Sequence, residues 1–331
     1  MTAAGSGEGI ALDCILGRSD SLRAEVFFRA TLPPGVDAAG ATLTGTLVGP
    51  ECRRAITLPV TAKLAAVRGG DVSGTPDALV ARAILTEPSY WTPELPNRYR
   101  LEARLEAAGR ELATWRRPLG LRRLGVRGRS LWLDGRRYVP RGLVATDAVD
   151  IAALRAAGLA AVVADPSEPF LDRCDAEGVA VIGLLAEACG KPLDVAAATA
   201  AVARWAWHPA VLAAVVPHDA AADATPALTA AIRGRRDTVL LGREVDGSEP
   251  SVEVVDGIDL LVVALPAGGL PHDAWRAAPL AVPLLARRAG ETGAAPEPSR
   301  RGCDALQAAL AAWRACGAPG PQPDWAGYLV G

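Results

Sequence analysis

The stretch that decides the fold is His208-Pro-Ala-Val-Leu-Ala-Ala-Val-Val-Pro217-His218-Asp219, an apolar run of strand length that ends in two ionisable residues. An alanine-rich, helix-like segment over 195–207 comes directly before it. A continuous apolar run next to a helical segment is typical of a parallel strand that is buried on both faces. In a barrel of such strands the active site lies at the carboxyl ends, which is where His218 and Asp219 follow the run.

Further apolar runs of strand length occur before and after this one, and helix-like segments separate most of them. The expected strands cover 138–144, 160–164, 179–185, 211–216, 239–241, 260–265, 280–285 and 328–330, and the expected helices cover 151–157, 168–177, 195–207, 226–235 and 304–316. Strands that alternate with helices form parallel sheets, so this order predicts a short (β/α)₈ TIM barrel over residues 119–331.

The first part of the chain has a different pattern. Short segments of alternating or nearly alternating polarity cover 24–32, 41–48, 55–60, 78–85 and 98–105, with Pro, Gly and Asp between them. Short strands at such intervals predict an antiparallel β-sandwich, which we assign to residues 10–118. We expect residues 1–9 to be disordered.

The bulk composition excludes several classes of protein. The chain has 331 residues, a net charge of −2 and no apolar run of the length that a membrane span requires. The near-neutral charge gives no electrostatic reason to expect nucleic acid or membrane as a partner. The first residues lack the basic and apolar regions of a secretory signal, so we expect a cytoplasmic protein.

The cysteines and the short motifs indicate no cofactor. The six cysteines form no Cys-x-x-Cys pair, and no Walker, dinucleotide, serine-triad or His-Glu-x-x-His pattern is present. We therefore expect neither a metal site nor a cofactor. The sequence does not decide whether Cys14 and Cys52 form a disulfide bridge, although reduced thiols in a cytoplasm are the simpler interpretation.

Three segments resemble a known family. The first is Pro88-Ser-Tyr-Trp-Thr-Pro-Glu-Leu-Pro-Asn-Arg-Tyr99, the second is Leu131-Trp-Leu-Asp-Gly-Arg-Arg-Tyr-Val-Pro-Arg-Gly-Leu143, and the third is Phe170-Leu-Asp-Arg-Cys-Asp-Ala-Glu-Gly178. Together with 208–219 they resemble the family 2 glycoside hydrolases, the β-galactosidase and β-glucuronidase group. The resemblance implies an immunoglobulin-like β-sandwich, with Trp91 and Tyr99 packed in it, followed by a TIM barrel.

The resemblance also implies where a catalytic site would lie. Retaining glycosidases use two carboxyl groups, one as nucleophile and one as acid and base. The family supplies them at the ends of barrel strands four and seven, and Asp219 takes the position of the first, with His218 beside it as the best candidate for proton transfer. The same alignment puts Leu284 at the nucleophile position, and a hydrocarbon side chain cannot attack an anomeric carbon. The active site would then be degenerate.

Other polar residues are expected at the carboxyl ends of the strands. The candidates for substrate binding are Asp165, Glu187, Arg243 and Glu244, and Asp324 is expected at the same edge. Trp325 resembles the aromatic residue at the floor of the family's sugar pocket. The alternatives are that Asp219 caps a helix or pairs with a neighbour, and that polar side chains gather in these loops because loops are solvated.

These observations leave three hypotheses for the function. The first is an inactive or impaired glycoside-hydrolase-like protein, a pseudoenzyme that binds carbohydrate or a protein partner. The second is a working glycosidase with a relocated carboxylate pair, Asp219 with Glu187 or Glu244. The third is a scaffold that recruits a partner through a surface patch.

Overall fold

A computed structural model describes residues 10–67, 78–185, 193–221, 223–232, 239–250, 255–278, 280–289, 295–316 and 324–331. The expected disorder of residues 1–9 therefore lies outside the described residues. The chain divides into two compact units. Unit 1 runs to Arg122 apart from Thr92–Glu94, and these three residues belong to unit 2 together with Arg123–Gly331.

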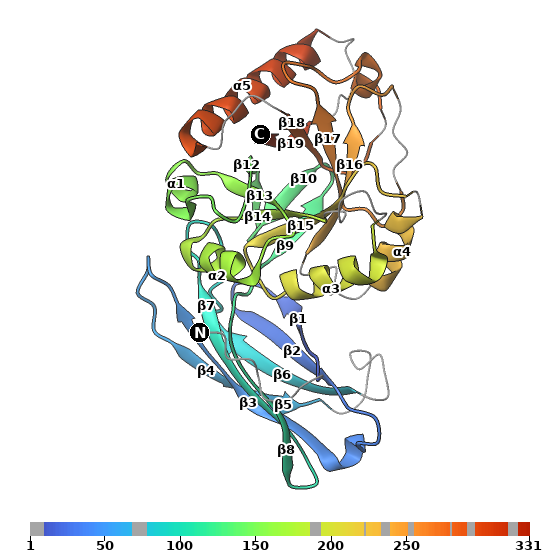
Figure 1. Ribbon diagram of the computed structural model, residues 1–331. Helices are drawn as coiled ribbons and strands as arrows, with labels where there is room; N and C mark the ends of the chain where they lie inside the picture. Colours follow the sequence, from blue (N-terminus) through green and yellow to red (C-terminus); the bar gives the residue numbers. More distant parts are fainter. Residues whose placement is uncertain are drawn as a thin grey trace. The chain divides into compact units, whose positions relative to one another are not determined.

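Unit 1 is a β-sandwich of two antiparallel sheets, as predicted (Figure 1). One sheet has the order β1-β2-β6-β5 and the other has the order β4-β3-β7-β8. The strands are β1 (Leu12–Ser19), β2 (Arg23–Thr31), β3 (Ala41–Glu51), β4 (Val60–Lys63), β5 (Ala65–Ala66), β6 (Ala78–Thr86), β7 (Arg98–Ala107) and β8 (Arg110–Leu119), with a 3₁₀ turn, η1, at Ala38–Gly40.

The alternation in the sequence explains the core of unit 1. Every second residue of β2 and β7 is buried, because successive side chains of a strand point to opposite faces of a sheet. Tyr99 is buried in this unit, and its hydroxyl accepts a hydrogen bond from the Ser89 backbone N–H at 2.8 Å. The strand expected over 55–60 is wrong, since β4 begins only at Val60. Pro59 cannot donate to a strand ladder, and Ile56 and Leu58 are fully exposed.

Unit 2 is a closed barrel of eight parallel strands preceded by a small antiparallel sheet (Figure 1). The small sheet contains β9 (Leu124–Arg127), β10 (Ser130–Leu133) and β11 (Arg136–Tyr138). The barrel strands are β12 (Arg141–Ala145), β13 (Ala160–Ala164), β14 (Val181–Leu184), β15 (Val211–Val216), β16 (Leu240–Asp246), β17 (Leu260–Leu265), β18 (Leu284–Arg288) and β19 (Trp325–Val330). The barrel closes because β12 pairs in parallel with both β13 and β19.

Within the described ranges of unit 2, five α-helices accompany the barrel strands. They are α1 (Ile151–Ala156), α2 (Glu168–Glu177), α3 (Val195–Trp205), α4 (Ala224–Ala231) and α5 (Pro296–Ala315), and a 3₁₀ turn, η2 (Asp273–Arg276), follows β17. Asp150 and Asp194 cap α1 and α3 by accepting backbone N–H bonds in the first turn. None of the helices in the described ranges combines the length and the apolar character that a membrane crossing requires.

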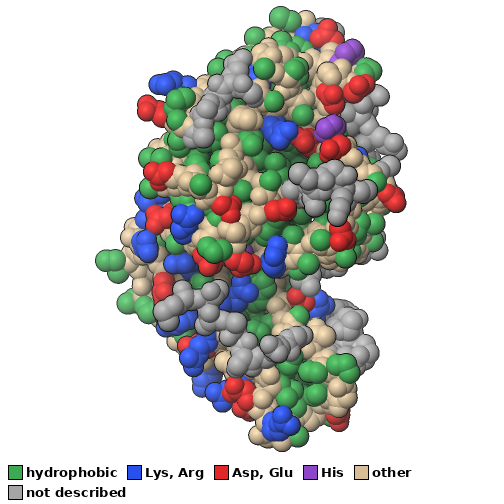
Figure 2. Space-filling view, viewed as in Figure 1, with side chains coloured by type: hydrophobic (Ala, Val, Ile, Leu, Met, Phe, Trp, Pro, Cys, Tyr) green, Lys and Arg blue, Asp and Glu red, His purple; other side chains and the backbone are tan. Residues whose placement is uncertain are grey.

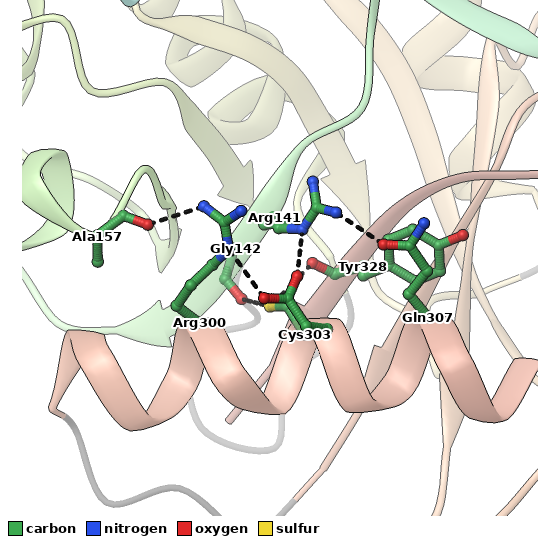
Figure 3. A network of polar contacts seen from close by, with 8 residues as sticks. Arg141, Gly142, Ala157, Arg300, Cys303, Gln307 and Tyr328 are labelled. Carbon is green, nitrogen blue, oxygen red and sulfur yellow. Dashed lines mark hydrogen bonds and ion pairs between the residues drawn. The ribbon is translucent and has the colours of Figure 1, made fainter.

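The longest helix, α5, is attached to the strands where the barrel closes (Figure 3). The Arg141 guanidinium at the start of β12 donates to Asp304 at 2.8 Å and to Gln307 at 2.7 Å, both on α5. Arg300, one turn earlier on α5, donates to the Ala157 carbonyl at 3.0 Å. Between them the buried Cys303 thiol contacts backbone carbonyls of β12 and β19. These bonds hold the last helix against the first and last strands.

The barrel interior is apolar, and the small sheet closes its amino end. Leu124, Val126 and Leu131 of that sheet pack in the same cluster as the interior side chains of the barrel. The interior side chains in this cluster include Val162, Ile182, Val215, Leu240, Val262, Leu285 and Leu329. We therefore expect polar side chains that point inward at the opposite, carboxyl end of the strands.

Candidate functional site at the carboxyl end of the barrel

Two charged side chains point into the carboxyl end of the barrel from β16 and β18. Leu240 and Leu285 belong to the interior cluster, and each strand has a side-chain period of two. Glu244 is four residues after Leu240 on β16, and Arg287 is two residues after Leu285 on β18, so both lie on the interior face.

Glu244 and Arg287 form an ion pair in which the Arg287 Nη2 lies 2.7 Å from the Glu244 Oε1. The Glu244 side chain is 8% exposed and the Arg287 side chain is 22% exposed, so the pair is largely shielded from water. Burial raises the pKa of the Glu244 carboxyl group, although the positive charge of Arg287 acts in the opposite direction. Desolvation of the carboxylate is thus not fully compensated by its partner.

His218 and Asp219 lie beside this ion pair. Both are exposed residues directly after β15, where Pro217 ends the strand. The His218 backbone N–H donates to the Glu244 carboxylate, and the charges of His218 and Asp219 both act on Glu244. Three of the residues predicted for the site, His218, Asp219 and Glu244, are therefore brought together.

Asp246 is at the end of β16 and is held by its own loop. Its Oδ1 accepts the Ser248 backbone N–H at 2.8 Å and the Ser248 hydroxyl at 2.7 Å, and these bonds lower the pKa of Asp246. At the end of β18, Arg288 donates from its Nη2 to the Gly269 carbonyl of the loop after β17 at 2.8 Å. On the face of the barrel unit seen in Figure 2, basic, acidic and histidine side chains stand next to one another.

Other predicted site residues lie elsewhere. Arg243 points away from the barrel interior and hydrogen-bonds the Thr225 hydroxyl of α4, because neighbours on a strand face opposite sides. Asp165 is exposed after β13 with a φ of 42°, a left-handed conformation that Asp tolerates. Glu187 lies outside the described residues.

Trp325 and Asp324 are at the amino end of the barrel, so their expected place at the carboxyl edge is corrected. Trp325 begins β19 and is 3% exposed. Asp324 pairs with Arg137 at 2.7 Å and with Arg314 at 3.1 Å. The expected strand over 328–330 was too short at its start, and the extra residues of β19 separate Trp325 from the carboxyl end.

The position of Leu284 is also corrected. The strand expected over 280–285 is instead β18 (Leu284–Arg288), so Leu284 is its first residue and not its end. Leu284 pairs with Leu261 and with Trp325 and is fully buried. The side chains at the carboxyl end of β18 are Arg287 and Arg288, and no carboxylate occurs within 284–289. The sequence prediction missed both arginines because apolar residues occur before β18 as well as within it, so the strand was placed too early. The run Leu284-Leu285-Ala286 followed by two charged residues could have indicated the true end of the strand.

A second polar cluster lies beneath α2, away from the barrel mouth. His208 is 2% exposed, and its Nδ1 lies 2.7 Å from Asp175 while its Nε2 lies 3.0 Å from Glu168. Burial alone would lower the pKa of His208, but the two carboxylates outweigh it and raise the pKa to about 9. Possible metal-ligand atoms of Asp172, Asp175 and His208 lie within 4.8 Å of one another. Because both ring nitrogens face carboxylate oxygens, however, the contacts are those of a histidinium held between two acids.

Comparisons with known proteins match the two units in different ways. The family model "Glycosyl hydrolases family 2" matches residues 42–122, which lie in unit 1 apart from Thr92–Glu94. No curated protein matches the sequence. Similar solved structures cover between 77% and 97% of this chain, at identities that show the fold alone.

Three of these structures illustrate the likeness. A putative β-galactosidase from Bacteroides fragilis has a TM-score of 0.63 and 15% identity over 96% of this chain and 54% of its own. A β-glucuronidase from Bacteroides uniformis has a TM-score of 0.62 and 14% identity over 96% and 45%. A β-glucuronidase from Bifidobacterium dentium has a TM-score of 0.59 and 13% identity over 97% and 59%. The present chain spans about half the length of these relatives.

The resemblance seen in the sequence is thus confirmed. The chain resembles the family 2 glycosyl hydrolases, by sequence over residues 42–122 and by fold through both the sandwich and the barrel.

Proposed function

We propose that this glycosidase-like protein binds a carbohydrate at the carboxyl end of its barrel and has little or no hydrolytic activity. The observation that carries the proposal is the ion pair between Glu244 and Arg287. It sits on the interior face of two strands at the edge where barrel enzymes bind their substrates.

The ion pair is unfavourable for glycoside hydrolysis by the retaining route. That route needs one carboxylate free to attack the anomeric carbon and a second carboxyl group about 5–5.5 Å away. The Glu244 carboxylate is held by a guanidinium at 2.7 Å, and the end of β18 has arginines in place of an acid. The proposal of a degenerate catalytic site therefore rests on Arg287 and Arg288, and no longer on Leu284.

The same groups are suited to binding. A carboxylate offers acceptors and a guanidinium offers donors, whereas each sugar hydroxyl is both a donor and an acceptor. A fixed pair of the two can thus hold neighbouring hydroxyl groups without breaking any bond of the ligand. The relatives named β-galactosidase and β-glucuronidase support a saccharide as the ligand class.

The test combines a binding assay with a turnover assay on the full chain. We expect isothermal titration to detect a simple β-glycoside, and we expect aryl β-glycosides to be hydrolysed no faster by the wild type than by Asp219→Asn. Glu297→Gln is a matched control, because it removes a carboxylate that is 86% exposed on α5. Robust turnover that Asp219→Asn abolishes and Glu297→Gln retains would overturn the proposal.

A second candidate function is an active glycosidase that uses Glu244 and Asp219. The observation in its favour is that burial raises the pKa of Glu244 while Asp219 lies close enough to act on it. A buried carboxyl group with a raised pKa next to an ionised one is the usual arrangement of a general acid and its partner. In this case Glu244→Gln and Asp219→Asn would each remove the hydrolytic activity. The rate of hydrolysis would fall as pH rises through the pKa of Glu244, because a general acid must be protonated to act.

We also propose that the protein resides in a reducing compartment such as the cytoplasm. Among the described residues, Cys14, Cys52, Cys174, Cys303 and Cys316 are free thiols, so Cys14 and Cys52 are not bridged. Free thiols of this number are common in reducing compartments.

A further inference from the structure

Arg287 is the only guanidinium on the interior face of β18, and part of its hydrogen-bonding capacity is unused. Its Nη2 contacts the Glu244 Oε1 at 2.7 Å, while its buried Nε has no hydrogen-bond partner among the described residues. A guanidinium has five N–H donors, and the Arg287 side chain is 22% exposed. Arg287 therefore keeps a donor for a ligand after it has bound Glu244.

The charge of Arg287, in contrast to this donor, is already matched. Glu244 neutralises it at close range in a shielded position. Asp219 follows β15 and Asp246 ends β16, so two more carboxylates flank the pair. Arg288 supplies the second guanidinium of this strand end but donates to the Gly269 carbonyl.

An anionic ligand would meet an unfavourable field here. Its carboxylate would compete with Glu244 for Arg287 and would approach Asp219 and Asp246, and placing like charges together is costly in a specific interface. An uncharged ligand would meet a donor and an acceptor side by side, and it would leave the ion pair intact.

We propose that the barrel mouth selects uncharged saccharides over acidic ones, and that Glu244 sets this preference by occupying the guanidinium of Arg287. This inference rests on the proposed carbohydrate binding and names its ligand class. Glu244 acts as a specificity-determining residue, since it leaves Arg287 able to donate hydrogen bonds but with no net charge to offer.

The experiment uses the full chain and two pairs of probes that differ only at C6. One pair is methyl β-D-glucopyranoside and its uronate, and the other is methyl β-D-galactopyranoside and its uronate. Titration calorimetry at low salt measures each Kd for the wild type, for Glu244→Gln and for the control Glu297→Gln.

We expect the wild type and Glu297→Gln to bind at least one neutral probe about tenfold more tightly than its uronate. Glu244→Gln keeps the shape of the side chain and removes its charge, which frees Arg287 for a charge-assisted bond to a carboxylate. The preference should then move toward the uronate by about tenfold or more, and the gain should disappear in Glu244→Gln/Arg287→Gln.

The outcomes separate this inference from the function on which it rests. If none of the four probes binds the wild type, the proposed carbohydrate binding fails and the inference falls with it. If uronates bind the wild type as well as the neutral probes do, or if Glu244→Gln leaves the preference unchanged, the inference is overturned while carbohydrate binding stands. Circular dichroism of each variant shows whether it is folded, and the wild-type ratio alone tests the preference should Glu244→Gln misfold.

Discussion

The carboxylate of Glu244 on β16 and the guanidinium of Arg287 on β18 meet at 2.7 Å across β17, the strand that lies between them in the barrel. In the register of the barrel Glu244 is opposite Val262 and Arg287 is opposite Ala264, so the two charged residues are two positions apart along β17. The ion pair thus links the ends of β16 and β18, two strands that backbone hydrogen bonds connect only through β17.

Breaking this pair from one side should destabilise the barrel in a pH-dependent way. Arg287→Leu leaves a carboxylate that is 8% exposed without its cation, and removing one partner of a buried ion pair costs about 3–5 kcal/mol. The cost belongs to the charged form, so it should be largest at neutral pH and should shrink as pH falls and Glu244 takes up a proton.

Thermal unfolding between pH 4.5 and 8 checks this prediction. The double variant Glu244→Leu/Arg287→Leu removes both charges and should recover most of the loss. A deficit in Arg287→Leu that is constant with pH would mean that Glu244 is not the cause.

His208 should make the stability of the protein fall at alkaline pH. Its pKa is raised in the folded state to about 9, above the unfolded value of 6.5. The stabilisation is therefore complete below the unfolded pKa and is lost as pH rises through the folded pKa, by about 3 kcal/mol in total.

Denaturant unfolding at pH 6.5 and at pH 10 measures this loss. In His208→Gln the extra pH dependence should disappear, whereas His272→Gln, at an exposed position before η2, should retain it. Nitrogen chemical shifts of the ring at pH 7 should show two protonated nitrogens on His208, and a neutral ring would contradict the assignment.

Gly183 on β14 should tolerate no side chain. A Cβ at this position would lie 2.7 Å from the Cζ3 of Trp205, a buried residue at the end of α3. Gly183→Ala should therefore cost about 1–3 kcal/mol through overpacking. Gly125→Ala is the matched control, since its Cβ would have no neighbour within 4 Å, and equal melting temperatures for the two variants would refute the packing argument.

Cys303 should resist alkylation in the folded protein. It is fully buried between α5 and the closing strands, and burial raises its pKa to about 11, so little reactive thiolate forms at pH 8 (Figure 3). Cys316, exposed after the same helix, should react first with iodoacetamide. Peptide mass spectrometry gives the order of labelling, and early modification of Cys303 would show that α5 detaches from the barrel.

The sequence predicted the bounds of a strand best where the hydropathy pattern allowed a single interpretation. The runs at β13, β15 and β17 were predicted residue for residue, because a parallel strand covered on both faces must be apolar throughout and is bounded by polar loops. It was least informative at β18. Leu280, Ala281 and Val282 are as compatible with a strand as Leu284–Ala286, and hydropathy alone does not say which of them pair with β17.

The sequence by itself determined that the chain forms a sandwich followed by a parallel barrel, and it indicated that His218, Asp219 and Glu244 lie at one edge. Only the tertiary structure decided what those residues do there, by placing Arg287 against Glu244 and Leu284 at the far end of its strand. The physical reason is that burial of apolar surface is recorded in local periodicity. The field at a carboxylate, in contrast, depends on which distant charge the barrel's register brings within a few ångströms.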